Sequence, residues 1–313
     1  MKVAAVILNY NDGDGTIEAV RRIEAFESID TVIVVDNAST DGSAEHIRAK
    51  LREMNRALME SDDEVDDDSI YHRYMLVESD KNGGYGYGNN IGVQYAYEIA
   101  GAELVLIANP DAVFSEEIVT GMAAIFDREH DAAAVGALMA GNGAHVTYQD
   151  CMRSAWPLRS VVGELLNSGP ICRRLFRCWL NYDASHFIGH STVEVDAVHG
   201  SLLMVDADRF LALGGFDEEM FLYGEENVLA AKLKEMGYKT FLLLNGSYRH
   251  EGSASITGTG HKAVERERLR QQSEQYYYRT YLNASMPLMG FVHLFQAVVM
   301  LETSIAEHLH LIK

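Results

Sequence analysis

The stretch that most restricts the fold is residues 104–114, with the sequence LVLIANPDAVF. A short, uninterrupted apolar run of this kind is typical of a strand buried on both faces of a parallel sheet. Because Pro110 has no N–H to give to a neighbouring strand, we expect this strand to end at about Asn109. Asp111 would then lie just beyond the carboxyl end of a central strand, where open α/β sheets bind their ligands.

Three further apolar runs precede this one, and segments with helical periodicity separate them. The runs are residues 2–10, 31–35 and 74–78. Strands that alternate with helices in this way predict βαβ units and a parallel sheet. We therefore expect residues 1–114 to form a nucleotide-binding half in which four strand ends meet at one edge.

Polar residues follow several of these strands. Those expected at the ligand edge are Asn9, Asn11, Asp36, Asn37, Asn109 and Asp111. The glycine-rich stretch at 81–92, KNGGYGYGNNIG, predicts a loop whose backbone approaches a ligand closely, ahead of a helix at 91–100. Its spacing matches neither the dinucleotide-binding pattern G-x-G-x-x-G nor a P-loop.

Residues 115–255 are expected to form a second half that binds an acceptor. Its predicted elements are a helix from Ser115, a strand at 132–139, a strand pair within 193–206, a helix at 225–236 and a strand at 241–244 that leads to His250. The small, polar segment at 251–260 has the composition of a mobile flap. We expect acceptor contacts within 140–190, which includes Trp156 and Trp179; for the arginines at 173, 174 and 177 a solvated helix face is the simpler interpretation.

Composition excludes some classes of partner. A net charge of −20 argues against nucleic acid, which requires a basic face. A protein this acidic needs a cation or helix N-termini to hold a phosphate. The acidic block at 60–68 predicts a solvated loop. Three cysteines without CxxC spacing predict neither a disulfide framework nor a zinc site, so we expect a reducing cytosol, and no secretory signal is visible.

The last segment, 256–313, is expected to continue the flap and end in a helical extension. Residues 286–301 are apolar apart from His293 and Gln296. A membrane span needs about 20 apolar residues, so this run is short for one. It predicts a packed or dimer-forming helix, with a helix that lies on a membrane surface as the alternative.

Five segments in this order resemble the family 2 glycosyltransferases of the GT-A fold, and among them the rhamnosyltransferase-like branch. The segments are VAAVILNYN, VIVVDNASTDGS, NGGYGYGNNIG, IANPDAVF, and GGFDEEMFLYGEEN with the later RHEGSAS. They extend over residues 3–255. The resemblance implies an α/β fold with a mostly parallel central sheet, flanking helices and a helical C-terminal extension.

The resemblance implies a divalent metal, Mg²⁺ or Mn²⁺, that neutralises the diphosphate leaving group. Asp111 of NPD matches the last aspartate of the D-x-D motif, and His250 matches the second protein ligand. Asp36 resembles the aspartate that accepts a hydrogen bond from the pyrimidine N3–H. The residues that fall where the family lines the base, ribose and phosphates are Asn9, Asn82, Gly84 and Asn90.

The resemblance also implies a carboxylate general base that takes the proton of the acceptor hydroxyl. Glu226 matches this position as a glutamate in place of the family's aspartate, and Glu225 beside it keeps the local charge. Val228 replaces the family's second aspartate, which indicates an altered acceptor site or a weakened enzyme. The expected acceptor-binding residues are Gly200, Ser201 and Asp217.

A single displacement with one base implies inversion at the anomeric carbon. The segments look most like enzymes that use dTDP-rhamnose, while UDP-hexose donors stay open. The implied acceptor is a saccharide or a lipid-linked saccharide in cell-surface polysaccharide synthesis at the cytoplasmic face of a membrane.

Three other functions compete with this one. A nucleotidyltransferase needs a basic loop after the first strand, and NYNDGDGT contains no Lys or Arg. A non-catalytic relative that binds the nucleotide-sugar is suggested by Val228 and stays open. A lectin-like or structural role would leave Asp36 and Asp111 without a shared purpose.

Overall fold

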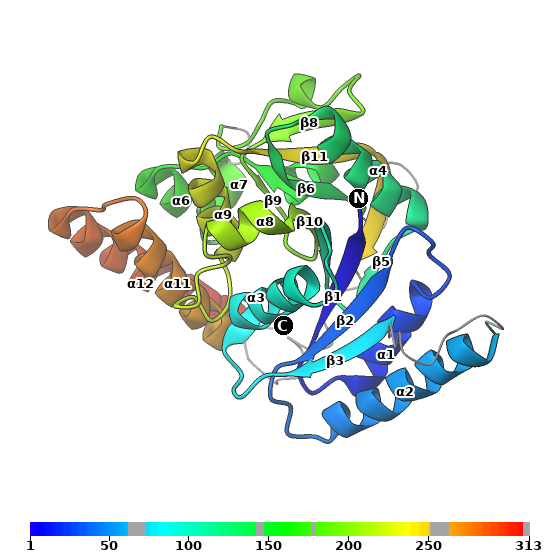
Figure 1. The fold of residues 1–313 in the computed structure, drawn as a ribbon. Coiled ribbons are helices and arrows are strands. Elements are labelled where there is room, and N and C mark those ends of the chain that lie inside the picture. Colours follow the sequence, from blue (N-terminus) through cyan, green and yellow to red (C-terminus); the bar gives the residue numbers. More distant parts are fainter. Residues whose placement is uncertain (62–72, 142–146, 177–178, 251–262, 309–313) are drawn as a thin grey trace.

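The computed structural model describes residues 1–61, 73–141, 147–176, 179–250 and 263–308. Within them a nine-stranded sheet forms the centre, helices cover both of its faces, and two C-terminal helices lie beside one end (Figure 1). Most of the predicted acidic loop and the whole of the predicted flap at 251–260 lie outside the described residues, as does Cys178; Cys151 and Cys172 are free thiols.

The predicted βαβ alternation of the first half is confirmed. Its elements are β1 (Val3–Asn9), α1 (Gly13–Arg22), β2 (Thr31–Asp36), α2 (Ser43–Ser61), β3 (Tyr74–Glu78), α3 (Gly84–Glu98) and β4 (Leu104–Ala108). The four strands are parallel and lie in the order β3-β2-β1-β4, so their carboxyl ends share one edge. In this register Asn9 lies beside Asp36.

The second half extends the same sheet with strands of mixed direction. Its elements are β5 (Ala112–Val113), α4 (Glu116–Arg128), β6 (Ala132–Met139), α5 (Tyr148–Ser154), β7 (Ala155–Trp156), α6 (Val161–Asn167), α7 (Pro170–Phe176), the 3₁₀ turn η1 (Ala184–His186), β8 (Thr192–Val195), β9 (Ala197–Val198), β10 (Leu202–Asp206), α8 (Ala207–Ala212), α9 (Glu225–Glu235) and β11 (Lys239–His250). The order continues β4-β10-β6-β11-β5.

The strand pair predicted within residues 193–206 is wrong. That stretch forms three short strands that do not pair with each other: β8 pairs with β11, β9 with β7, and β10 with β4 and β6. The apolar pattern marked the strands correctly, but their partners are distant in the sequence and leave no local signal.

Alternate side chains of β1 enter two different cores. Val3, Ala5 and Ile7 belong to the core that includes α1, α2 and α4, whereas Ala4 and Val6 belong to the core that includes α3, α8 and α9. Because helices cover both faces of the sheet, every position of the strand is apolar. This explains the uninterrupted apolar runs of the first half.

The glycine-rich stretch is a helix rather than the predicted loop. Helix α3 begins at Gly84, and its glycines lie against the sheet. A Cβ on Gly88 would come within 2.3 Å of Leu8 Cδ1, and one on Gly92 within 2.4 Å of Val6 Cγ1. These glycines therefore permit close packing of the helix on β1, not the approach of a backbone to a ligand.

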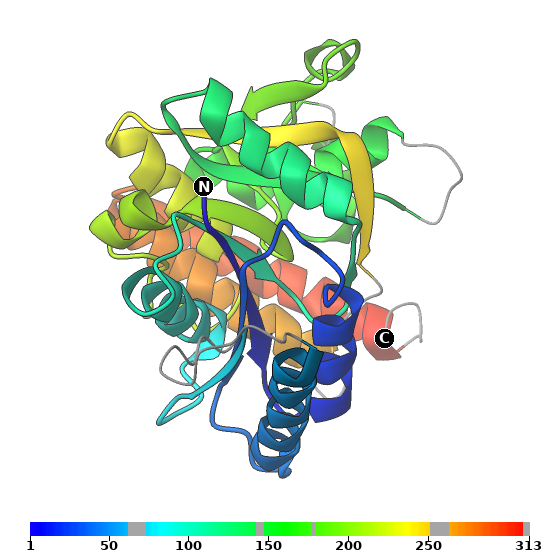
Figure 2. The same ribbon diagram turned by 45° about the vertical axis from the view of Figure 1, so that its right-hand side comes forward.

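Strand β11 spans the whole second half of the sheet. Its first part pairs with β8 on one side and β6 on the other, and its last two residues, Arg249 and His250, pair with β5. The register with β6 shifts between Leu243 and Ser247. Figure 2 shows the resulting bend, which carries the yellow strand across the sheet and down toward β5.

The C-terminal extension consists of α11 (Ala263–Thr280) and α12 (Met286–His308). Its buried residues form a third core with α6 and the start of α9, which includes Val161, Val228 and Tyr278. By length and composition α12 is the one described helix that is apolar enough to cross a membrane; 28% of its most apolar window is buried within the chain.

Candidate active site

Asp111 and His250 meet at the edge of the sheet. Asp111 follows β4 and precedes β5, and the pairing of β11 with β5 places His250 opposite Ala112. As a result His250 Nε2 lies 3.2 Å from Asp111 Oδ1, and both side chains are 19% exposed. The structure therefore brings together the two residues predicted to hold a metal.

Asp111 Oδ2 is buried without a hydrogen-bond partner among the described residues, and His250 Nε2 makes no hydrogen bond there beyond its contact with Asp111 Oδ1. An unsatisfied buried polar atom costs about 1–3 kcal/mol, so such atoms indicate a ligand. Carboxylate oxygen and imidazole nitrogen both bind divalent transition-metal cations such as Mn²⁺. The pair could supply two ligands to such a cation; the described residues contain no cluster of three or more potential metal-binding side chains.

The ends of β1 and β2 form one hydrogen-bonded network. The Asn9 side-chain amide donates to Asp36 Oδ1 at 2.6 Å and to the hydroxyls of Ser39 and Ser43 at 3.1 Å. Asp36 Oδ2 accepts from the backbone N–H of Ser39 at 3.0 Å. Asn9 and Asp36 are buried at 0% and 2% exposure, so Asn9 acts here by holding the Asp36 carboxylate in place.

A second network joins the ends of β2 and β3. The Asn37 amide donates to Asn82 Oδ1 at 2.9 Å and to the backbone carbonyl of Gly84 at 3.0 Å. Asn11, in a left-handed conformation with φ of 53°, accepts from the backbone N–H of Thr40 at 2.8 Å. The structure thus places six of the residues predicted to bind the nucleotide around the ends of β1 to β3: Asn9, Asn11, Asp36, Asn37, Asn82 and Gly84.

Two further residues predicted to bind nucleotide have other contacts. The Asn90 side chain donates to the Phe216 carbonyl at 3.0 Å and accepts from the Phe216 N–H at 2.9 Å, which anchors the loop before α9 to α3. The backbone N–H of Asn109 donates to the carbonyl of Ser201 at 2.9 Å. Asn109 therefore links the Asp111 segment to the loop beside Glu226.

The two glutamates predicted at the catalytic position have different surroundings. Glu226, in the first turn of α9, lines a cavity, and its Oε1 accepts from the backbone N–H of Gly200 at 3.1 Å. Glu225 is 3% exposed, and its Oε1 has no partner among the described residues. Burial, followed by repulsion from Glu226, raises the pKa of Glu225 to about 8. Glu226 is consequently the carboxylate with access to a ligand.

The loop at 199–201 lies between Glu226 and the pair formed by Asp111 and His250. The Tyr85 hydroxyl donates to the Gly200 carbonyl at 2.7 Å, and Ser201 shares a hydrogen bond of 2.7 Å with the buried Tyr248. A Cβ at Gly200 would lie 3.0 Å from Glu226 Oε1, so a larger residue would crowd the carboxylate. Gly200 thus contacts Tyr85 and Glu226 through its backbone, whereas the Ser201 side chain contacts Tyr248.

His199 is a candidate functional residue that the sequence analysis did not select. Its ring centre lies 5.7 Å from that of His250 and 6.5 Å from that of Trp156, and its Nδ1 accepts from the backbone N–H of Ser201. Burial lowers the pKa of His199, and the nearby Glu226 opposes that shift. No sequence signal distinguished it, because its neighbours come from four separate segments.

A cavity of about 560 Å³ opens beside Glu226, within the size range of ligand sites. Trp156, His199 and Asn227 line it, and the indole N–H of Trp156 donates to Asn227 Oδ1 at 2.7 Å. Trp156 therefore lies where acceptor contacts were expected. Trp179 does not line the cavity and is 85% exposed.

Asp217, predicted to bind the acceptor, is bonded within the protein. Its Oδ2 accepts from the hydroxyls of Tyr276, at 2.9 Å, and Tyr281, and its Oδ1 accepts from the backbone N–H of Glu219. These bonds fasten the loop before α9 to the C-terminal helices. The structure favours this positioning role for Asp217.

Val228, which replaces the family's second aspartate, is fully buried in the third core beside Tyr277 and Tyr278 of α11. An aspartate here would face apolar side chains, and burial of an unpaired carboxylate is costly. The position at which this chain departs from the family pattern is therefore one at which α9 packs against α11.

A family model described as glycosyl transferase family 2 matches residues 4–193, which is more than half of the chain. The chain belongs to glycosyl transferase family 2. The hexosyltransferase Agl10 of low-salt glycan biosynthesis, from Haloferax volcanii, is 24% identical to this family member over 225 residues. That alignment covers 72% of this chain and 59% of the relative, less than two thirds of its length.

A second relative of this member of family 2 is the N-acetylglucosaminyl-diphospho-decaprenol L-rhamnosyltransferase of Mycobacterium tuberculosis. It is 24% identical over 232 residues, which cover 72% of this chain and 67% of the relative. These matches support the predicted resemblance to the rhamnosyltransferase-like branch.

Solved structures with the GT-A fold resemble the chain. A mannosyltransferase from Pyrobaculum calidifontis in complex with GDP-Man and Mn²⁺ superimposes with a TM-score of 0.59 at 15% identity, over 97% of this chain and 73% of that one. GalNAc-T7 with UDP, GalNAc and Mn²⁺ gives 0.58 at 14% identity, over 80% and 44%. The predicted GT-A fold is confirmed.

Proposed function

We propose that this protein is an inverting, metal-dependent glycosyltransferase that moves a sugar from a nucleotide-diphospho-sugar to a hydroxyl of a saccharide or lipid-linked acceptor. The observation that carries the proposal is the arrangement of Glu226 at a cavity, joined by the loop at 199–201 to the pair of Asp111 and His250, in which Asp111 Oδ2 has no hydrogen-bond partner among the described residues. Transfer of a glycosyl group uses a base for the acceptor hydroxyl and positive charge near the diphosphate, and this arrangement connects the candidates for both.

In the proposed reaction Glu226 accepts the proton of the acceptor hydroxyl as that oxygen forms a bond to the anomeric carbon. The bond between the anomeric carbon and the diphosphate oxygen breaks, and the nucleoside diphosphate leaves with the electron pair. The Gly200 N–H holds Glu226 Oε1, which leaves Oε2 for the incoming hydroxyl. Attack from the face opposite the leaving group inverts the configuration.

Asp111 and His250 would hold Mg²⁺ or Mn²⁺, which when bound supplies positive charge to balance the diphosphate. Asp36, held by Asn9 and Ser39, keeps free lone pairs that suit the N3–H of a pyrimidine. dTDP-rhamnose is the first candidate donor because one relative is named a rhamnosyltransferase, and UDP-hexoses are the second because another is named a hexosyltransferase.

Calorimetric titration of dTDP-rhamnose and a panel of UDP-hexoses, with and without Mn²⁺, tests the proposal. We expect one donor to bind only with metal, and we expect Asp111→Ala to weaken that binding at least tenfold. Asp127→Ala on the exposed side of α4 is the matched control and should bind as the wild type does. Binding that is indifferent to both metal and Asp111 would remove the basis of the proposal.

A non-catalytic nucleotide-sugar-binding role is the second candidate, because Val228 leaves the family's second carboxylate position apolar. Turnover separates the two functions. An enzyme consumes the donor when an acceptor is supplied, whereas a binding protein retains it unchanged through many equivalents of acceptor.

The exposed side of α12 leads us to propose self-association as the role of the C-terminal helix. Its exposed apolar residues follow the alternating three- and four-residue spacing of a coiled-coil seam, at Phe291, Leu294, Val298, Leu301 and Ile305. Helix α12 contains no Lys or Arg, which an anionic membrane surface would favour. A cytoplasmic dimer is proposed, with membrane attachment as the competing outcome.

A further inference from the structure

The loop at 216–224 leads directly into the helix that carries Glu226. Its last two residues, Tyr223 and Gly224, have left-handed backbone conformations, with φ of 74° and 90°. This conformation is rare for a bulky residue such as tyrosine, and it persists only where the surrounding structure enforces it. The contacts of the loop must therefore supply that constraint.

Helix α3 holds the loop from one side. The backbone N–H of Tyr85 donates to the Phe221 carbonyl at 3.1 Å. Asn90 makes two hydrogen bonds to the backbone of Phe216, as donor at 3.0 Å and as acceptor at 2.9 Å. These bonds fix the first part of the loop to the half of the chain predicted to bind the nucleotide.

The C-terminal extension holds the loop from the other side. The Ser273 hydroxyl of α11 donates to the Leu222 carbonyl at 2.7 Å. The hydroxyls of Tyr276 on α11 and of Tyr281 just beyond it both donate to Asp217 Oδ2. Each of these bonds joins a residue of the extension to the loop, so the position of the loop depends on that of α11.

An apolar contact adds to these hydrogen bonds. Met220 of the loop is 1% exposed and belongs to the third core together with Tyr277 and Tyr278 of α11. A Cβ on Gly224 would lie 2.9 Å from Met220 Cε, so the end of the loop closes tightly over this side chain. The loop therefore packs on the extension as well as bonding to it.

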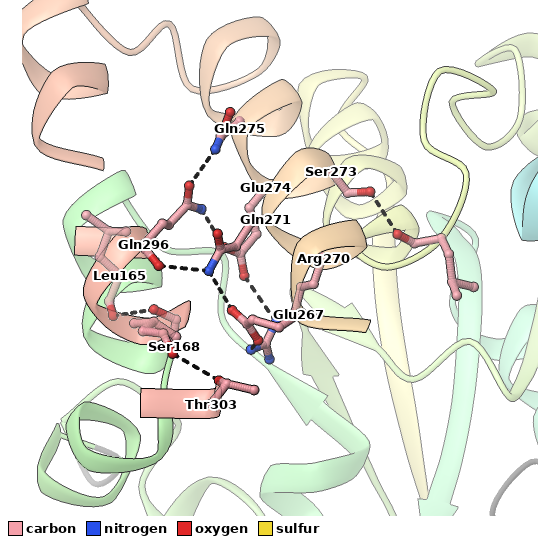
Figure 3. A network of polar contacts seen from close by, with 12 residues as sticks. Leu165, Ser168, Glu267, Arg270, Gln271, Ser273, Glu274, Gln275, Gln296 and Thr303 are labelled. Atoms are coloured by element: carbon pink, nitrogen blue, oxygen red, sulfur yellow. Dashed lines mark hydrogen bonds and ion pairs between the residues drawn. The ribbon is translucent and has the colours of Figure 1, made fainter. Parts of the chain in front are cut away.

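A polar network fixes α11 itself, as Figure 3 shows. The Gln296 amide of α12 donates to Glu274 Oε2 at 3.0 Å, and Gln275 donates to Gln296 Oε1 at 2.7 Å. Gln271 donates to the Gln296 carbonyl at 3.1 Å, in a bond that is buried. Satisfied networks of this kind make a structure more rigid, so α12 holds α11 in a fixed position against the loop.

Glu226 needs accurate placement to act as a base. A base must lie within about 2.6–3.2 Å of the atom that bears the proton, and a displacement of about 1 Å can lower a rate about a hundredfold. Glu226 lies in the first turn of α9, directly after the left-handed residues of the loop. A change in the loop would therefore move Glu226 relative to the Gly200 N–H, from which it accepts at 3.1 Å.

We infer that the C-terminal extension takes part in catalysis, in that α11 positions Glu226 by holding the loop at 216–224. The positioning residues are Ser273, Tyr276 and Tyr281. None of the three is among the residues that line the cavity beside Glu226, so they act through the loop and not on a ligand. The inference rests on the proposed function, which gives Glu226 its role, and adds the extension to the parts that this function requires.

Hydrogen exchange on the full chain tests the link to the loop without relying on activity. Ser273→Ala removes one bond to the loop, and Tyr276→Phe combined with Tyr281→Phe removes two. In both variants the backbone amides at 217–228 should exchange about three- to tenfold faster than in the wild type, the effect of a lost hydrogen bond, while those of β1 and β2 keep their rates. Gln275→Ala is the matched control, because it removes a bond from α11 to α12 but none to the loop.

Turnover tests the consequence for catalysis. Release of the nucleoside diphosphate from the donor that binds in calorimetry, with Mn²⁺ present and water as the acceptor, gives kcat and the donor KM. Ser273→Ala and the double tyrosine variant should each lower kcat about tenfold and change KM less than twofold. Gln275→Ala should keep both constants within twofold. A role in stability alone would leave kcat of the folded enzyme unchanged.

Three results would overturn the inference. They are wild-type exchange at 217–228 in both loop variants, wild-type kcat in both, and an equal fall of kcat in Gln275→Ala. Thermal melts identify any variant that fails to fold, and the double tyrosine variant keeps the test decisive if Ser273→Ala is lost. Absence of turnover in the wild type would instead reject the proposed function, while hydrogen exchange would still decide whether α11 holds the loop.

Discussion

At the scale of single residues, Glu225 and Glu226 show how neighbouring carboxyl groups acquire different chemistry. Glu226 lines the cavity and is oriented by the Gly200 N–H, while Glu225 is buried without a hydrogen-bond partner for its Oε1 among the described residues. Glu226 is the proposed acceptor of a proton from a ligand, whereas burial raises the pKa of Glu225 to about 8 and keeps it protonated near neutral pH.

Glu226→Gln tests the assignment of the base. The amide cannot take the proton from the acceptor, so turnover should fall by about 10²- to 10⁴-fold, the range found for general bases. Donor affinity, measured by calorimetry, should stay within twofold because Gln keeps the size and shape of the side chain. Glu235→Gln at the exposed end of the same helix should retain full turnover. Full turnover in Glu226→Gln would exclude this residue as the base.

Glu225 should make stability fall as pH rises. Its pKa lies near 8 in the folded chain and near 4.5 when unfolded, so between these values the folded state holds the extra proton. The free energy of unfolding then decreases by up to about 1.4 kcal/mol per pH unit through this window. Glu274, with a pKa raised by burial to about 7, acts in the same direction up to that pH.

Urea unfolding at pH 5.5 and pH 8 measures this loss. Glu225→Gln removes one titrating group, so its loss of stability between the two pH values should be clearly smaller than that of the wild type. Glu235→Gln, exposed at the other end of α9, should keep the wild-type loss. An equal loss in Glu225→Gln and wild type would contradict the assigned cause.

At the scale of secondary-structure elements, α3 depends on glycine for contact with β1. Gly92→Ala would place a Cβ 2.4 Å from Val6 Cγ1 in the fully packed core and should destabilise the fold by about 1–3 kcal/mol. The same substitution at Gly290 of α12 meets no atom within 4 Å and should stabilise by about 0.5–1 kcal/mol through helix propensity. Chemical denaturation of both variants measures the contrast, and equal effects would contradict this packing role.

The strands of the first half could be predicted because each is buried on both faces and therefore apolar throughout. The edge on which Asn9, Asp36 and Asp111 gather followed from their parallel direction. The start of α3 could not be predicted, because glycines that permit close packing and glycines that form a loop have the same local sequence. Only the contact with Leu8 and Val6 distinguishes them.

At the scale of the whole molecule, the cavity combines segments that are far apart in the chain. Trp156, Glu164, His199, Glu226 and Glu274 lie on five different segments. No periodicity or motif links them, so the sequence could indicate Glu226 but not that residues of α11 line the same cavity. The position of α11 depends on tertiary contacts such as the bond of Ser273 to Leu222.

The exposed stripe of α12 predicts a concentration-dependent dimer. Replacing Leu294 and Leu301, which are 67% and 61% exposed, by lysine should shift the protein to a monomer without lowering its melting temperature by more than a few degrees. Light scattering at several concentrations measures the change. The same double substitution at Arg52 and Glu53, exposed on α2, should leave the oligomeric state unaltered.

A monomer at all concentrations would reject self-association. Co-sedimentation of the wild type with anionic vesicles would instead assign the exposed apolar residues of α12 to a membrane surface. In that case the variant with the two lysines should lose co-sedimentation only at high salt.

The register shift in β11 has a consequence for insertions and deletions. Strand β11 pairs with β6 up to Leu243 and again from Ser247 onward, and residues 244–246 lie between these two paired parts. Removal of one residue there would turn His250 to the opposite face of the sheet, away from Asp111, because successive side chains point to opposite sides. The number of residues in this segment is therefore constrained as strictly as the identity of the histidine at its end.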